Sequence, residues 1–360
     1  MHEVTLEPLQ GEAAAPGHCA APVRRVSPGG YDVIGNVRGS SERLLKMLRH
    51  LGYEPSADLI WHHPGGRTAV FTGGIATPHG NTTPCTSLVR SMVDAGTALC
   101  VLGAGEFDAI AAAHAPRRVR VPATSPTTHD ERSGLGDDGL GDDGLGERGL
   151  GDDGLGERGL GERGLGDDGL IAWLRTLALW LDLPELRVVH ACWSDFDIDS
   201  LRDLLGSNCL ADDDAVVTAS TPGSAANLAI RILLRGHEIT LPDHAHWCSA
   251  DGTMHRTASF RWWSTGPLTL RDRAIALPGI TDCNGEPHRG FDDSAITEAV
   301  PVLFGGPPVI VADAPLHGAT PPTTTEVLFL DTHASHPAQL VAYRSSGEQH
   351  ITLDHLVVVP

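Results

Sequence analysis

The segment from Tyr31 to Gly39, Tyr-Asp-Val-Ile-Gly-Asn-Val-Arg-Gly, contains residue types that can bind an anion. Arg38 offers a planar guanidinium that matches two oxygens of a phosphate. Gly35 and Gly39 permit a tight turn whose backbone N–H groups can also face an anion. The apolar residues before the turn suit a buried strand, and open α/β sheets place their sites at such strand ends. A plain structural turn is the alternative interpretation.

Three other groups have residue types that bind metal ions: His62 with His63, His244 with His246, and the alternating Asp195, Asp197 and Asp199. Adjacent histidines point apart on a strand, so the first pair is a poor joint site. The second pair would share one strand face, but no further ligand converges there in the sequence. The three aspartates lack the glycine and the closing glutamate of a calcium loop, so we expect them to be solvated.

Four later segments resemble, in order and spacing, the signatures that follow such a turn in the calcineurin-like metallophosphoesterases. They are Val-Phe-Thr-Gly-Gly-Ile-Ala-Thr-Pro-His-Gly at 70–80, Cys-Val-Leu-Gly-Ala-Gly-Glu at 100–106, Val-Val-His-Ala at 188–191 and Leu-Phe-Gly-Gly at 303–306. Residues 233–263 and 340–348 are similar to a bacterial branch related to diadenosine tetraphosphatases and Ser/Thr phosphatases. The resemblance implies an α/β fold, a sandwich of two mixed β-sheets flanked by helices.

In that family six residues hold two metal ions. The resemblance places the six positions at Asn36, Arg38, Gly74, Ala104, His190 and Gly306. His190 alone keeps the family's ligand type. The position of the presumed proton donor to the leaving group is Gly105, and the position of the phosphate-gripping arginine is His79. The resemblance therefore implies a degenerate site, in which glycines of the scaffold remain and most metal ligands are replaced.

Two-metal hydrolysis needs two cations that activate a hydroxide and clamp the phosphate, so the loss of five ligand positions predicts an inactive site. We expect a protein without a cofactor that binds a phosphate or nucleotide ligand or acts as a scaffold. The ligand-binding residues would be Arg38, Gly35, Gly39 and Gly103. In the alternative interpretation, Arg38 points to solvent or pairs with Glu106.

The alternative function is a metal-dependent phosphohydrolase acting on a phosphoprotein or a dinucleoside polyphosphate. Its pair of Mn, Fe or Zn ions would need replacement ligands, for which the candidates are His62, His79 and His317.

Short apolar strands alternate with helices along the chain, which is typical of parallel α/β pairing. We expect strands at 31–34, 68–71, 98–102 and 187–190, and helices at 40–51, 86–95, 171–181 and 224–234. Toward the end of the chain we expect strands at 309–312, 327–331, 339–344 and 351–359.

The α/β pattern is interrupted between residues 116 and 169. From Gly134 to Asp168 the chain repeats Gly-Leu-Gly followed by Asp-Asp or Glu-Arg, a period that fits neither helix nor strand. We expect a disordered acidic insert at 116–169, between two halves of one domain at 30–115 and 170–360. Residues 1–29 have no apolar period and are expected to form a flexible tail.

The formal net charge of the chain is −20, and the 134–168 repeat contributes −8 of it, from eleven acidic residues and three arginines. The remaining −12 is still acidic, which argues against nucleic-acid binding by a broad basic surface. Seven scattered cysteines without Cys-x-x-Cys spacing indicate reduced thiols. No run of 18 apolar residues or signal pattern is present, so we expect a cytoplasmic protein without a membrane partner.

Overall fold

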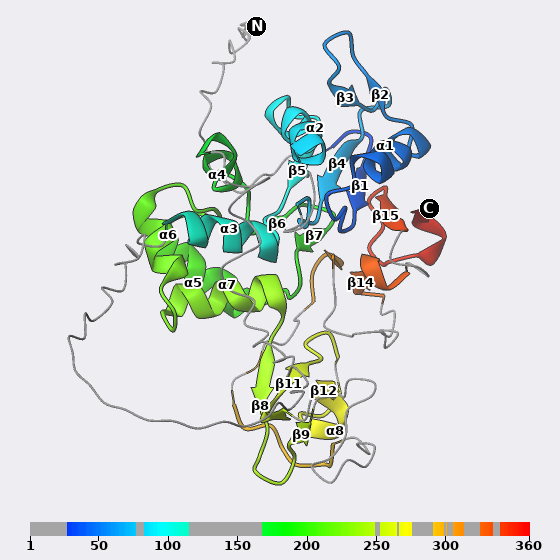
Figure 1. The fold of residues 1–360 in the computed structure, drawn as a ribbon. Helices are drawn as coiled ribbons and strands as arrows, with labels where there is room; N and C mark the ends of the chain where they lie inside the picture. The colour runs from blue at the N-terminus through cyan, green and yellow to red at the C-terminus, as the bar shows by residue number, and fades with distance from the viewer. Residues whose placement is uncertain are drawn as a thin grey trace, which may run out of the picture.

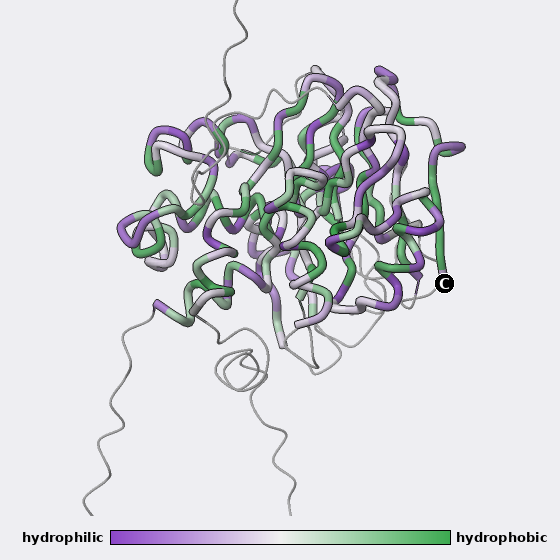
Figure 2. Tube along the Cα trace, turned by 90° about the horizontal axis from the view of Figure 1, so that it is seen from above, coloured by the Kyte–Doolittle hydropathy of each residue, from purple (hydrophilic) through white to green (hydrophobic). Residues whose placement is uncertain are grey.

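A computed structural model of the protein describes residues 27–76, 83–114, 168–248, 253–264, 266–275, 291–298, 300, 305–312, 325–333 and 339–360. These residues form two mixed β-sheets, a group of helices and a smaller β-lobe (Figure 1). Apolar stretches gather in the interior of the trace, and hydrophilic ones lie mainly at its outer turns (Figure 2). None of the helices in these ranges has the length and apolar character needed to cross a membrane.

The first sheet has five strands in the order β16-β15-β1-β4-β5. Their bounds are β1 (Tyr31–Ile34), β4 (Thr68–Phe71), β5 (Ala98–Cys100), β15 (Leu340–Ser345) and β16 (Leu356–Val359). Strands β1, β4 and β5 run parallel, whereas β15 is antiparallel to β1 and β16 is antiparallel to β15. The central strand β1 is buried along its whole length, as expected for a strand covered on both faces.

The second sheet has four strands in the order β14-β13-β7-β6. Their bounds are β6 (Trp180–Asp182), β7 (Arg187–Val189), β13 (Val309–Val311) and β14 (Val327–Phe329). Strands β7, β13 and β14 are parallel, and β6 is antiparallel to β7. Val101, just after β5, forms a parallel bridge with Ala178, just before β6, and this bridge joins the two sheets along one edge.

One hydrophobic cluster contains alternate residues from both sheets. Val33 and Val70 belong to it from the first sheet, and Val188, Ile310 and Leu328 belong to it from the second. Because alternate residues of a strand point to opposite faces, one face of each sheet contributes to this single cluster. The predicted α/β class with mixed sheets is therefore confirmed.

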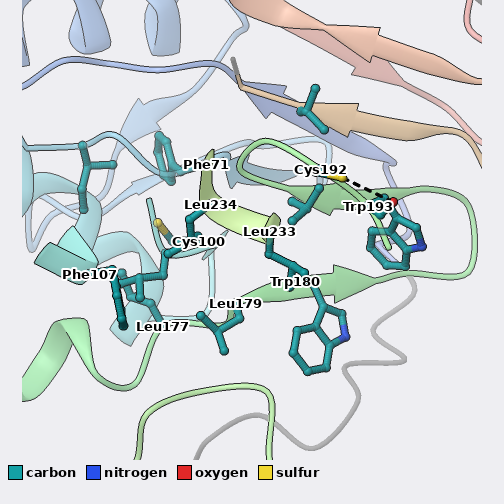
Figure 3. Close-up of a cluster of buried hydrophobic side chains, with 14 of the residues drawn as sticks. Phe71, Cys100, Phe107, Leu177, Leu179, Trp180, Cys192, Trp193, Leu233 and Leu234 are labelled. Carbon is teal, nitrogen blue, oxygen red and sulfur yellow. Dashed lines mark hydrogen bonds between the residues drawn. The ribbon is translucent and has the colours of Figure 1, made fainter. Parts of the chain in front are cut away.

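The helices pack on the outer faces of the sheets and on one another. Helices α1 (Ser41–His50) and α2 (Thr83–Asp94) contact the first sheet. The other long helices, α3 (Ala104–His114), α4 (Asp168–Leu174), α5 (Asp195–Leu205), α6 (Asp213–Ser220) and α7 (Ala225–Arg235), contact one another (Figure 1). Phe107 and Leu234 of this group lie close to Phe71 and Cys100 of the first sheet, so helices and sheet share one core (Figure 3).

The smaller lobe spans the described residues of 238–275, which we call the β8–β12 lobe. It contains β8 (Glu238–Thr240), β9 (Trp247–Cys248), β10 (Met254–His255), β11 (Thr257–Phe260), α8 (Leu270–Arg273) and β12 (Ala274–Ile275). Strands β12, β11 and β8 form a three-stranded sheet, and β9 pairs with β10. A separate hairpin pairs β2 (Glu54–Pro55) with β3 (Trp61–His62). The 3₁₀-helices are η1 (Leu330–His333) and η2 (Leu353–His355).

The predicted helix at 40–51 is confirmed, with Ser40 as its N-cap accepting a hydrogen bond from the Arg43 N–H. The predicted helix at 171–181 is wrong in its second half. Strand β6 begins at Trp180, because Trp180 and Leu181 pair with β7. Helix α4 begins at Asp168, so the predicted insert ends slightly earlier than expected.

The predicted boundary of the N-terminal tail is also wrong by a few residues. Ser27 is buried and its hydroxyl donates to the carbonyl oxygen of Gly30, so the packed body begins before residue 30. The rest of the predicted tail and most of the predicted insert lie outside the described residues. Among the described cysteines, Cys85, Cys100 and Cys192 are free thiols, whereas Cys209 is disulfide-bonded, which the expectation of reduced thiols did not include.

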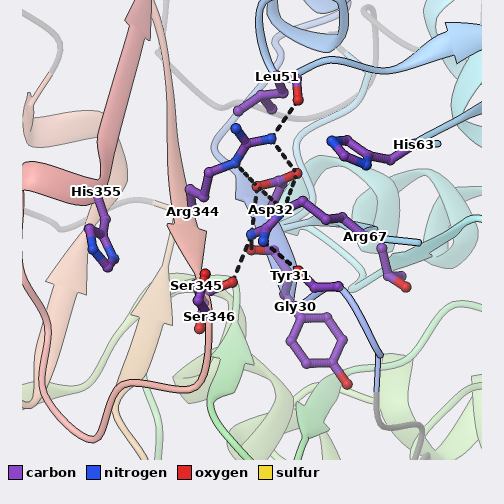
Figure 4. Close-up of polar contacts among 12 residues, drawn as sticks. Gly30, Tyr31, Asp32, Leu51, His63, Arg67, Arg344, Ser345, Ser346 and His355 are labelled. Atoms are coloured by element: carbon purple, nitrogen blue, oxygen red, sulfur yellow. Dashed lines mark hydrogen bonds and ion pairs between the residues drawn. The ribbon is translucent and has the colours of Figure 1, made fainter. Parts of the chain in front are cut away.

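Asp32 is a fully buried carboxylate in the central strand β1. It accepts hydrogen bonds from Arg67 Nε, at 3.0 Å to each oxygen, and from Arg344 Nε at 2.9 Å (Figure 4). Arg67 also donates to the backbone carbonyls of Tyr31 and Ser345, both at 2.7 Å. A buried carboxylate is stable only when it is paired and hydrogen-bonded, and here two arginines fulfil that condition while joining β1 to its neighbours.

We expect Asp32→Ala to lower the free energy of unfolding by about 3–5 kcal/mol, because it leaves two arginines beside an empty buried site. Asp94→Ala, which removes the exposed pair between Asp94 and Arg90, is the matched control and should cost less than about 1 kcal/mol. Denaturant unfolding of both variants measures the difference. Equal effects would show that the buried network contributes no more than a surface pair.

Candidate functional site

The loops that follow the parallel strands of both sheets meet at one edge of the sheet pair. His190, after β7, lies 2.8 Å from the carbonyl oxygen of Thr72, after β4. The Arg38 N–H, after β1, donates to the carbonyl oxygen of Gly74 at 2.8 Å. We call the polar residues that meet here the strand-end cluster: Asn36, Arg38, Gly74, Glu106, His190 and Asp331.

Arg38 forms an ion pair with Asp331, which follows β14. Arg38 Nη2 lies 2.8 Å from Asp331 Oδ2, and the side chains are 41% and 12% exposed respectively. Asp331 Oδ1 accepts the Asn36 N–H at 3.2 Å. Arg38 has a left-handed backbone (φ 52°), which is unusual for a residue with a side chain and is held by these contacts. The alternative in which Arg38 pairs with Glu106 is therefore wrong, because its partner is Asp331, while the side chain is partly exposed to solvent.

Glu106 is a buried carboxylate in the first turn of α3. Its oxygens accept the Gly74 N–H at 3.2 Å and the Ala76 N–H at 2.9 Å. These donors belong to the loop after β4, so Glu106 ties that loop to the helix after β5. The position also places a negative charge at a helix N-terminus, where the helix dipole favours it.

Gly74 and Gly103 are required by the space around them. A Cβ atom on Gly74 would lie 1.9 Å from Asn36 Oδ1, and one on Gly103 would lie 2.3 Å from Glu106 Oε2. Real Cβ atoms do not approach other atoms so closely. The glycines therefore remain because the Asn36 amide and the Glu106 carboxylate fill the adjacent space.

Ala104 and Gly105 begin helix α3, next to the cluster. A Cβ on Gly105 would meet no atom within 4 Å, so this position is open. His79, the predicted counterpart of the phosphate-gripping arginine, lies outside the described residues, as does His317.

His190 is buried just beyond the last residue of β7. A carbonyl oxygen can only accept, so the 2.8 Å contact with Thr72 means that Nδ1 carries a proton and donates. In the neutral ring Nε2 is then the acceptor. The histidine thus links the second sheet to the loop after β4, which is a structural role that needs no metal.

Gly306 is not part of the strand-end cluster. A Cβ on Gly306 would lie 3.0 Å from Arg187 Nη1. Arg187 is the first residue of β7, whereas His190 follows the last. Gly306 therefore contacts a different side chain of this segment from the one that meets the loop after β4.

The predicted anion-binding set of Arg38, Gly35, Gly39 and Gly103 does not converge as a group. The Gly35 N–H donates to the carbonyl oxygen of Val341 in β15 at 2.9 Å. Gly103 is backed by Glu106, whose negative charge opposes an anion there. Of this set, Arg38 presents the charge that an anion would need.

The other sequence candidates have local partners. His63 Nδ1 accepts the Gly65 N–H at 2.9 Å, and His244 Nε2 lies 3.0 Å from Asp292 Oδ2. Asp197 is buried in the first turn of α5, which corrects the expectation that it is solvated. Within the described ranges, no group of three or more His, Cys, Asp or Glu is arranged to hold a metal ion.

Sequence reasoning missed Asp331 as a member of the cluster and misjudged the role of Glu106. Asp331 lies just past an apolar strand, and the polar residues of the cluster near β1 and β7 also follow their strands. This shared position could have identified Asp331. Glu106 carries the signal of an acidic residue in the first turn of a helix.

A scan of the sequence against protein-family models gives no match, and a comparison with curated proteins gives no significant match. The resemblance to the metallophosphoesterases therefore stays a prediction.

We expect Gly74→Ala to destabilise the fold by at least about 2 kcal/mol, because the new methyl group collides with Asn36 and the left-handed backbone (φ 62°) disfavours a side chain. Gly105→Ala is the matched control and should stabilise α3 by up to about 1 kcal/mol. Thermal and denaturant unfolding measure both. A Gly74→Ala variant within about 0.5 kcal/mol of wild type would contradict the described position of Asn36.

Proposed function

We propose that this protein has a metallophosphoesterase-like sandwich architecture without two-metal hydrolysis, and that it acts as a scaffold or binding protein. The observation that carries the proposal is the filled space at the strand ends. The Asn36 amide lies where a side chain at position 74 would begin. A side chain at position 74 would require the Asn36 side chain to move, and Gly74 itself offers no metal ligand.

The donors in the cluster do not suit a pair of Mn, Fe or Zn ions. Divalent cations of this kind take carboxylates and imidazoles in convergent geometry. Asp331 is paired with Arg38, and both oxygens of Glu106 already accept backbone N–H groups. The guanidinium of Arg38 adds a positive charge, which opposes a bound cation. We therefore derive no hydrolytic step from these residues.

A phosphate-bearing small molecule or protein is the ligand class that Arg38 supports. The guanidinium is partly exposed and already orients one nitrogen toward an anion, the Asp331 carboxylate. A phosphate oxygen can replace that carboxylate because both bind the same N–H donors. The ligand would thus compete with Asp331, which predicts weak binding in the wild-type protein.

We expect the purified protein to hydrolyse p-nitrophenyl phosphate and dinucleoside polyphosphates at background rates with added manganese, and to contain no stoichiometric divalent metal. Colorimetric assay and elemental analysis at neutral pH measure these quantities. His190→Ala is the matched control, because any two-metal activity should depend on this retained ligand. If the protein contains two equivalents of metal and its hydrolysis is lost in His190→Ala, the phosphohydrolase alternative is correct.

Calorimetry with inorganic phosphate in the presence of chelator tests the ligand class. Arg38→Gln should weaken binding by about tenfold or more, since it removes charge-assisted hydrogen bonds. Asp331→Asn should strengthen binding, because it removes the competing charge, and Arg90→Ala should leave binding unchanged. If Arg38→Gln leaves the affinity for phosphate unchanged, the proposed phosphate site at Arg38 is wrong, whereas the scaffold proposal stands.

A further inference from the structure

The chain passes from α7 into β8 at the start of the β8–β12 lobe (Figure 1). His237 directly precedes β8. The His237 carbonyl oxygen accepts the Phe260 N–H of β11 at 2.8 Å. The lobe also packs through Trp262 and Trp263, which are both buried. The Trp263 ring lies 4.6 Å from the ring of Phe329 in β14. His237 therefore lies at the junction where the lobe docks on the body.

His237 is half-buried at this junction, and its two ring nitrogens lack compensating contacts. Both ring nitrogens are shielded from solvent and have no hydrogen-bond partner among the described residues. The ring meets Phe260 edge to face, with 5.6 Å between ring centroids. An imidazole in such surroundings has lost its hydrogen bonds with water, so its burial in the docked state costs free energy.

Three carboxylates and one thiol face His237 from the surrounding elements. They are Asp197 in the first turn of α5, Glu238 in β8, Glu298, which accepts the Thr240 N–H, and Cys192, whose sulfur accepts the backbone N–H of His237. The carboxylates favour a charged imidazole, but burial outweighs them and lowers the pKa of His237. Burial likewise raises the pKa of Asp197 and of the Cys192 thiol.

We propose that His237 is a pH-sensitive switch that keeps the β8–β12 lobe docked at neutral pH and releases it in mild acid. In water an imidazole takes up a proton near pH 6.5, whereas the docked ring resists protonation. The undocked state therefore binds more protons below that pH. The ratio of undocked to docked protein then rises by up to about tenfold for each unit by which the pH falls. Protonation of Asp197 has the opposite effect and favours the docked state. The pH range in which the lobe is released therefore lies below pH 6.5 and above the range where Asp197 titrates.

Hydrogen exchange of the full chain at pH 7.5 and pH 5.5, corrected for intrinsic rates, tests the switch. We expect protection in β8, β11 and β12 to fall by up to about tenfold at pH 5.5 while β1 and β4 stay protected. Fluorescence of Trp262 and Trp263 should shift to the red over the same range. Equal loss of protection in lobe and body, or no loss in either, would overturn the proposal.

Variants assign the effect to His237. His237→Phe should abolish the pH dependence, because a neutral ring remains beside Phe260 at both pH values. His237→Gln serves the same purpose with a polar side chain if the phenylalanine is too large. His246→Gln, which changes a half-buried histidine of the same lobe whose Nδ1 contacts the carbonyl oxygen of Asp243, is the matched control and should keep the wild-type response. A wild-type response in either His237 variant that folds would contradict the switch.

Discussion

The buried carboxylate of Asp32 is the interaction on which the arrangement of the first sheet depends. It lies in the central strand and receives one arginine from just before β4 and another from β15. Those two strands flank β1 on either side, so a single charge connects three strands that are far apart in the sequence. An apolar residue at this position would fill space, but it would leave two guanidinium groups without a partner.

Carboxylates also join distant segments at the carboxyl ends of the strands. Asp331 and Glu106 are protein carboxylates that accept the N–H groups and the guanidinium of neighbouring loops. Donors of this kind would otherwise attract a ligand anion or require water. Because the protein supplies the anions itself, the strand-end loops are held together without a bound group, and this favours a structural role for most of the cluster.

The lobe is held differently, mainly by aromatic packing. The rings of Trp262 and Trp263 pack against Phe329 of β14, and Asp331 follows Phe329 by two residues. The packing of the lobe and the ion pair of Arg38 therefore share one short segment of chain.

Local patterns in the sequence determined the central strands and several helices. Apolar runs placed β1, β4 and β7, and a serine cap with an apolar face placed α1. The tertiary structure alone decided which residues meet at the strand ends. Arg38 and Asp331 pair across most of the chain, and Gly306 lies against the side chain of Arg187. Periodicity reports which face of an element is buried, but it carries no information about the register between distant elements, and that register selects the partners of each polar side chain.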